Sequence, residues 1–134
     1  MRSLVCLPIA AALVLLLSGS APARTAIYDI QYTTDPSGNS PMVGQSVTIS
    51  GIVTAIFVSG YVVAEEAGPW HAIYVYSTRD GPKVGDEIGL SGTVFESGGM
   101  TRISSVTSYT RLSQGNALTP WPVNAPGSAM RWSP

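Results

Sequence analysis

The sequence has 134 residues, a formal net charge of −1 and a single cysteine, Cys6. Its 7 Lys and Arg against 8 Asp and Glu exclude a strongly basic nucleic-acid-binding protein, because sequence-independent affinity for phosphate backbones comes from counterions that Lys and Arg release. The length leaves room for one domain with one hydrophobic core.

Residues 1–23 have the pattern of a secretory signal peptide. Arg2 supplies the positive start, Leu4–Leu17 is an apolar run, and Ala21–Ala23 is a small-residue cleavage site. The run is shorter than the about 20 residues that a membrane-spanning helix needs. We therefore expect cleavage after Ala23 and a secreted or periplasmic domain without a stable membrane anchor. The only cysteine would be removed, and with it any disulfide, catalytic thiol or zinc-thiolate site.

Residues 24–42 precede the main domain. Thr25–Tyr32 alternates well enough between apolar and polar side chains to predict a short leading strand. Asp35–Pro41 comes next and is dense in Pro, Gly, Ser and Asn, which favour turns. We expect a strand followed by a loop.

One phrase occurs twice in the chain, as Val43–Val53 and as Val84–Val94. Each copy opens with Val-Gly and a polar residue, continues as an alternating apolar run, and has Ser-Gly in its middle. A glycine inside a strand usually marks a bulge or a sharp bend. The two copies predict two equivalent, strongly bent strands, at residues 47–58 and 88–95.

Three further strands are predicted from apolar alternation and turn signals. Tyr61–Glu65 returns from a turn at Ser59-Gly60, Ala72–Tyr76 alternates aliphatic and aromatic side chains, and Met100–Leu112 is rich in β-branched residues. No part of the mature chain has convincing helical periodicity.

Five strands with glycine bends predict an all-β domain at residues 43–113. A small five-stranded OB-fold-like barrel fits this pattern best. A small β-sandwich is the alternative, because strand spacing alone does not separate the two folds. Residues 114–134 are rich in proline and predict an extended tail or linker.

The order of these segments resembles a known family, the OB-fold module of secreted bacterial nucleases. The resemblance covers about Ile27 to Leu112 and implies a nucleic-acid-binding module that stands beside a catalytic domain of the endonuclease/exonuclease/phosphatase type. That catalytic domain has no counterpart in this chain. The sequence has Glu65-Glu66 where the family usually has a Gln-Asp type pair, followed by a shorter loop. The matching segments are Val43-Gly44-Gln45-Ser46-Val47-Thr48-Ile49-Ser50-Gly51-Ile52-Val53-Thr54-Ala55, Gly60-Tyr61-Val62-Val63, Ala72-Ile73-Tyr74-Val75-Tyr76, Val84-Gly85-Asp86-Glu87-Ile88 and Ser91-Gly92-Thr93-Val94.

Catalytic and metal-binding patterns are weak in this sequence. It contains no Gly-x-Ser-x-Gly elbow and no His-Glu pair with zinc spacing, and His71 is the only histidine. Glu65 and Glu66 lie near it, but neighbouring residues on a strand point to opposite faces, so at most one of them is expected to join His71. We expect no catalytic residues, no metal site and no cofactor.

The best candidate for function is a group of aromatic and basic residues. OB-fold ligands lie across the second and third strands and the loops at their edges. Tyrosine rings there can stack on bases, and cations can contact phosphates. The alternative is that these aromatic side chains pack the barrel or a partner domain. The candidate residues are Tyr61, Tyr74, Tyr76, Arg102, Lys83 and Arg79.

Two functional hypotheses follow. The first is a non-catalytic, extracytoplasmic module that binds single-stranded DNA or RNA weakly and assists a nuclease. The second is a spacer or interaction domain that docks a protein partner or a carbohydrate without binding nucleic acid.

Overall fold

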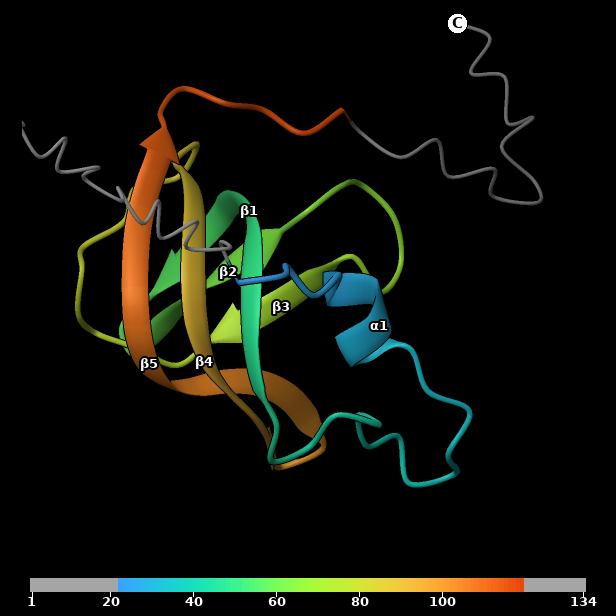
Figure 1. The fold of residues 1–134 in the computed structure, drawn as a ribbon. Helices are drawn as coiled ribbons and strands as arrows, with labels where there is room; N and C mark the ends of the chain where they lie inside the picture. The colour runs from blue at the N-terminus through green and yellow to red at the C-terminus, as the bar shows by residue number, and fades with distance from the viewer. Residues whose placement is uncertain (1–21, 120–134) are drawn as a thin grey trace, which may run out of the picture.

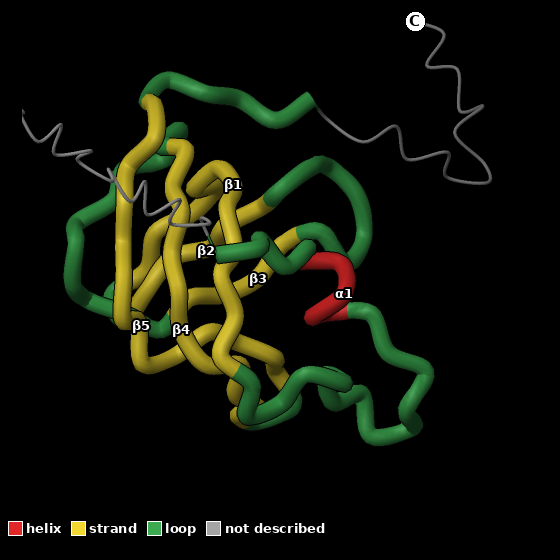
Figure 2. Tube along the Cα trace, in the orientation of Figure 1, coloured by secondary structure: helices red, strands yellow, loops and turns green. Residues whose placement is uncertain are grey.

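The computed structural model describes residues 22–119. Residues 1–21 of the predicted signal peptide and residues 120–134 of the predicted tail lie outside this range. Figures 1 and 2 show one short helix beside a set of strands that close on themselves. The elements are α1 (Ile27–Gln31), β1 (Ser46–Phe57), β2 (Gly60–Ala64), β3 (Ala72–Val75), β4 (Glu87–Ser97) and β5 (Met100–Ser113).

The strands form a closed barrel in the order β1-β2-β3-β5-β4. All neighbours are antiparallel except β3 and β5, which pair in parallel. Closure depends on β1, whose first half, Ser46–Ile52, pairs with β4 while Ile52–Phe57 pairs with β2. The prediction of a small, five-stranded all-β barrel is confirmed. The β-sandwich alternative is wrong, because one sheet closes on itself instead of two sheets packing face to face.

The glycines of the repeated phrase lie where the two strands bend. Gly51 lies against the backbone of Ala64, near the point where β1 changes its partner. A Cβ atom on Gly92 would lie 2.5 Å from Cγ2 of Ile103, and the pairing of β4 with β5 shifts register there. Neither site has room for a side chain, which is why the phrase needs glycine at both positions.

The core is made by alternate residues of all five strands, together with two isoleucines of α1 and one tyrosine. Each of these side chains is less than 5 % exposed, and the strand residues alternate with outward-facing ones as expected for strands with one buried face. The core residues are Ile27, Ile30, Val47, Ile49, Val53, Tyr61, Val63, Ile73, Val75, Ile88, Leu90, Val94 and Ile103.

The predicted leading strand is wrong, because Ile27–Gln31 forms the helix α1. Ile27 and Ile30 are three residues apart, so both lie on the helix face that packs against the barrel. The carboxylate of Glu65 accepts hydrogen bonds from the backbone N–H groups of Ile27 and Tyr28, at 2.8 and 2.9 Å. This acceptor is 38 residues away in sequence from Ile27, so local periodicity could not reveal it. Within residues 22–119, no helix has the length and apolar character needed to span a membrane.

Candidate nucleic-acid interface

A row of outward-facing side chains crosses the barrel from β1 to β4. Ala55 pairs with Val62, Val62 with Tyr74, Tyr74 with Arg102, and Arg102 with Phe95. Each of the last three alternates with buried residues of its own strand, so its side chain points away from the core. The parallel pairing of β3 with β5 is what places an aromatic ring beside an arginine.

Arg102 lies between two aromatic rings. Its Cζ atom is 4.6 Å from the centroid of Tyr76 and 5.3 Å from that of Phe95. Both rings are about half exposed, at 49 % and 48 %. Such cation–π contacts fix the guanidinium without neutralising it. The ion pairs described within residues 22–119 do not include Arg102.

Two further aromatic rings extend this surface toward the β1–β2 turn. Phe57, 57 % exposed, meets Tyr74 edge to face with ring centroids 6.2 Å apart. The hydroxyl of Tyr74 shares a hydrogen bond of 2.8 Å with Ser59 in the turn. We call the set of Phe57, Tyr74, Tyr76, Phe95 and Arg102 the aromatic face.

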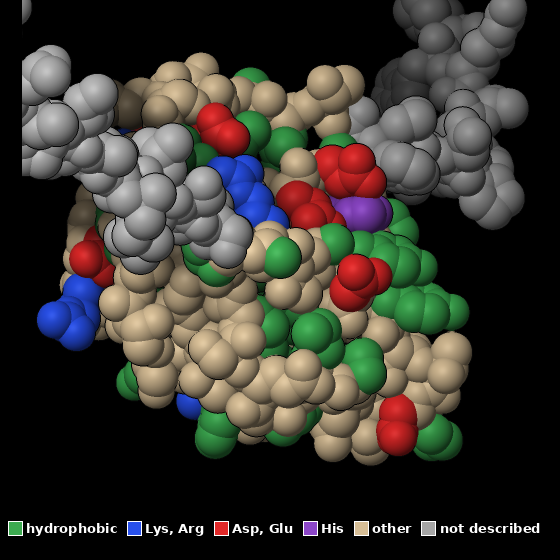
Figure 3. Space-filling view, in the orientation of Figure 1, with side chains coloured by type: hydrophobic (Ala, Val, Ile, Leu, Met, Phe, Trp, Pro, Cys, Tyr) green, Lys and Arg blue, Asp and Glu red, His purple; other side chains and the backbone are tan. Residues whose placement is uncertain are grey.

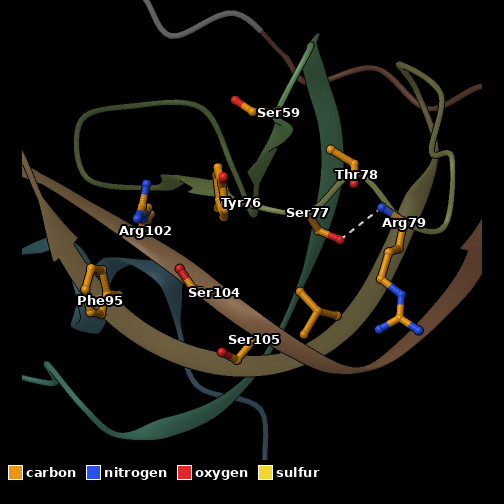
Figure 4. Close-up of a pocket in the computed structure, with 10 residues that line it drawn as sticks. Ser59, Tyr76, Ser77, Thr78, Arg79, Phe95, Arg102, Ser104 and Ser105 are labelled. Atoms are coloured by element: carbon orange, nitrogen blue, oxygen red, sulfur yellow. Dashed lines mark hydrogen bonds between the residues drawn. The ribbon is translucent and has the colours of Figure 1, made fainter.

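An open cavity of about 510 Å³ adjoins the aromatic face. Figure 4 shows Arg102 and Arg79 on opposite sides of it, with Ser104 and Ser105 of β5 between them. Hydroxyl side chains from the β1–β2 turn and from the segment after β3 complete its lining. Of the predicted basic residues, Arg79 therefore joins Arg102 around one cavity.

Two predicted residues do not belong to this surface. Tyr61 is only 1 % exposed and packs in the core, because its side chain points inward like that of Val63 on β2. The prediction that Tyr61 belongs to a stacking surface is therefore wrong. Lys83 lies in the turn before β4, where its backbone N–H bonds Oδ2 of Asp86. No contact described within residues 22–119 connects the Lys83 side chain to the aromatic face.

Phe57 and Phe95 belong to the surface and were missed by the prediction. The signal for Phe95 was present, because Ile88, Leu90 and Val94 set the inward phase of β4 and Phe95 falls in the other phase. For Phe57 there was no such signal, because β1 shifts register between Val53 and Ala55 and the alternation of buried and exposed residues does not continue past that point.

Burial raises the pKa of the Tyr61 phenol far above its ordinary value of 10.0, with smaller contributions from Tyr109 and Asp80. The Tyr61 hydroxyl is buried without a hydrogen-bond partner among the described residues. Burial likewise raises the pKa of Tyr109, helped by Asp86. The Tyr61 side chain is thus part of the core of the barrel.

A second aromatic group surrounds His71 at the end of α1. Tyr28 stacks on Tyr32 with centroids 5.2 Å apart, Tyr28 also lies 5.2 Å from the His71 ring, and Trp70 meets Tyr32 edge to face. Figure 3 shows the single histidine between acidic and hydrophobic side chains. We call these residues, together with Glu65 and Glu66, the α1 cluster.

Both glutamates contact His71, which corrects the expectation that at most one would. Nδ1 lies 3.1 Å from Oε1 of Glu65 and Nε2 lies 3.1 Å from Oε1 of Glu66. Both residues follow the end of β2 at Ala64, so strand alternation no longer separates their side chains. Within residues 22–119 no group of three or more His, Cys, Asp or Glu side chains is arranged to hold a metal ion.

Comparisons of the chain with protein-family models, with curated proteins and with solved structures found no match.

Proposed function

We propose that this protein is a non-catalytic OB-fold module that binds single-stranded DNA or RNA weakly through the aromatic face. The observation that carries the proposal is Arg102, a cation held between the half-exposed rings of Tyr76 and Phe95 and without an ion pair among the described residues. Aromatic rings that stack on bases and a cation that meets phosphate are the two components of sequence-tolerant single-strand binding.

The OB-fold assignment rests on the five-stranded closed barrel and on the position of the aromatic face. Exposed rings lie directly after β3, at Tyr76, and beside the β1–β2 turn, at Phe57, close to the strands and loop where OB-folds bind oligonucleotides. The signal-peptide pattern of residues 1–23 supports an extracytoplasmic location. We propose a nuclease, or a catalytic domain separate from this one, as the partner that such a module serves.

The composition of the surface predicts weak binding with a shallow salt dependence. Each stacked base contributes about 1–3 kcal/mol in known single-strand binders. Each phosphate contact adds about −0.7 to the slope of log K against log salt. Two arginines at the site, Arg79 and Arg102, therefore predict a slope of about −1.4.

The test is a fluorescence-anisotropy titration of the domain with labelled single-stranded DNA and RNA at several salt concentrations. Removal of the stacking ring in Tyr76→Ala should weaken binding about five- to thirtyfold, the equivalent of about 1–2 kcal/mol. Tyr32→Ala is the matched control, since Tyr32 is 44 % exposed against 49 % for Tyr76 but belongs to the α1 cluster. Absence of saturable binding at low salt would refute the proposal.

The α1 cluster favours a second candidate, an interaction domain for a protein or a carbohydrate. Its rings of Tyr28, Tyr32 and Trp70 are 37 %, 44 % and 47 % exposed. Trp70 also has a φ of 71°, a left-handed conformation that bulky residues rarely adopt and that often occurs at binding sites. Binding of this kind would barely respond to salt and would be lost in Trp70→Ala but not in Tyr76→Ala.

A further inference from the structure

We propose that the cavity between Arg79 and Arg102 is a phosphate-binding subsite, which takes a phosphate group of a nucleotide whose base stacks on Tyr76. The inference rests on the proposed function of the aromatic face. It adds a specific place for the backbone of the ligand and names the chemical group that is bound there.

The lining of the cavity has the chemistry that a phosphate requires. Arg79 and Arg102 supply cations, and hydroxyls come from the β1–β2 turn, from Ser77 and Thr78 and from β5. Among the residues that the structure describes, no Asp or Glu side chain lines the cavity. Neither arginine takes part in the ion pairs described within residues 22–119. Guanidinium and hydroxyl donors make short, charge-assisted hydrogen bonds to phosphate oxygens.

Two buried polar atoms in the cavity wall have no protein partner. Nε of Arg102 and Oγ of Ser104 are buried and make no hydrogen bond within the described part of the chain. The two residues are two positions apart on β5, so their side chains project from the same side of the strand. Buried polar groups are nearly always hydrogen-bonded. Two residues that line the cavity therefore carry polar atoms whose hydrogen-bonding capacity is unused in the described part of the chain.

The backbone beside the cavity is irregular in a way that shapes it. Thr93 pairs with Ser104 and Ser91 pairs with Ser108, so one residue of β4 between the two pairs lies opposite three residues of β5. This bulge contains Ser105, which has a φ of 50°. Bulges redirect side chains and occur preferentially next to binding sites, and left-handed non-glycine residues cluster there as well. The bulge faces the segment that carries Arg79 (Figure 4).

The phosphate could be an internal phosphodiester of a single strand or the terminal phosphate of an oligonucleotide end. Both present phosphate oxygens to the same donors. The sources are distinguished by titrating one short oligothymidylate in three forms, with free ends, with a 5′-phosphate and with a 3′-phosphate. Tighter binding of one phosphorylated form assigns the cavity to a terminus, and equal binding of all three assigns it to an internal phosphodiester.

The decisive variant is Arg79→Gln, which keeps a hydrogen-bonding side chain but removes the charge. We expect about three- to tenfold weaker binding and a salt slope smaller in magnitude by about 0.7, the contribution of one phosphate contact. Lys83→Gln is the matched control, because it removes a positive charge from the same β3–β4 connection but outside the cavity lining. The control should change affinity less than about twofold, as expected for a charge that makes no phosphate contact.

A second readout separates the subsite from the aromatic face. Thymidine 5′-monophosphate should shift the backbone amide resonances of Ser104 and Ser105, and Arg79→Gln should abolish these shifts. If oligonucleotides bind but Arg79→Gln binds them with wild-type affinity and salt slope, the subsite is refuted and the proposed function stands. If oligonucleotides do not bind but the monophosphate shifts these amides through Arg79, the proposed function fails and the phosphate site stands. Absence of both responses would refute both.

Discussion

Two surfaces of this protein expose aromatic rings next to charged groups, and they differ in the hydrogen-bonding capacity that remains free. In the α1 cluster, each ring nitrogen of His71 faces a carboxylate, and Glu65 also accepts two backbone N–H groups of α1. On the aromatic face, the guanidinium of Arg102 lies over two aromatic rings and takes part in none of the ion pairs described within residues 22–119, and its Nε atom is unpartnered among the described residues.

Exposed aromatic rings alone therefore do not indicate a nucleic-acid-binding site, because such a site also needs donors that are free to contact phosphate. The rings of the α1 cluster lie beside a network in which His71, Glu65 and Glu66 already contact one another and Glu65 holds the short helix α1 to the barrel. The aromatic face keeps donors that a ligand could use. We therefore expect changes in the α1 cluster to affect folding and changes on the aromatic face to affect binding.

The largest expected effect is on stability, in Glu65→Ala. This change removes the acceptor for the N–H groups of Ile27 and Tyr28 and for His71. Hydrogen bonds to a charged group contribute about 1.5–3 kcal/mol each when buried. Because the side chain is 21 % exposed, we expect a total loss of about 2 kcal/mol in the free energy of unfolding.

Urea unfolding measures this loss, and Glu66→Ala is the matched control. Glu66 is 65 % exposed, and its one ion pair described within residues 22–119 is with His71, so its removal should change stability by less than about 0.5 kcal/mol. The affinity of folded Glu65→Ala for single-stranded DNA should equal that of the wild type. Weaker binding by this variant would show that the α1 cluster also contributes to nucleic-acid binding.

A smaller effect, now on binding alone, is expected for Arg102→Met. Methionine keeps an apolar stem between Tyr76 and Phe95 but removes the cation, and one charge-assisted contact is equivalent to about tenfold in affinity. The free energy of unfolding, measured by thermal denaturation, should change by less than about 0.5 kcal/mol. Arg111→Met serves as the control, because Arg111 forms an ion pair with Asp86, with 3.4 Å between its Nη1 and Oδ2 of Asp86. Equal affinities for the two variants would contradict the role of Arg102.

The smallest effect is expected for a change at Tyr61, the one of the three predicted tyrosines that lies in the core. Tyr61→Phe removes a buried hydroxyl without a described partner and should raise stability by about 0.5–1 kcal/mol at neutral pH. Affinity for nucleic acid should not change. Destabilisation by more than about 1 kcal/mol would mean that the hydroxyl has a partner that stabilises the fold.

The same variant should extend stability to alkaline pH. Burial raises the pKa of Tyr61 above its ordinary value of 10.0, so the unfolded chain releases this proton before the folded protein does. Stability is therefore complete below about pH 10 and falls as the pH rises further. Urea unfolding at about pH 8 and about pH 11 should show a smaller alkaline loss in Tyr61→Phe than in the wild type. Tyr32→Phe, at an exposed position, controls for the loss of a phenol.

The sequence by itself determined the strands and their bends. The alternation of Val47 and Ile49 and its equivalent at Ile88 and Leu90 predicted β1 and β4, and the repeated Ser-Gly predicted where they curve. These features are local, because a strand needs only a period of two and a bend needs only a residue without a side chain. They favoured a small barrel but did not by themselves separate it from a small β-sandwich.

Only the tertiary structure decided which strands are neighbours and which faces look inward. The parallel pairing of β3 with β5 brings Tyr74 beside Arg102, and the sequence contains no local signal for that pairing. On β2 both phases are apolar, so only the closed core shows that Tyr61 points inward. The helix α1 likewise depends on the distant acceptor Glu65. Alternation fixes the two faces of a strand, whereas burial against distant residues chooses between them.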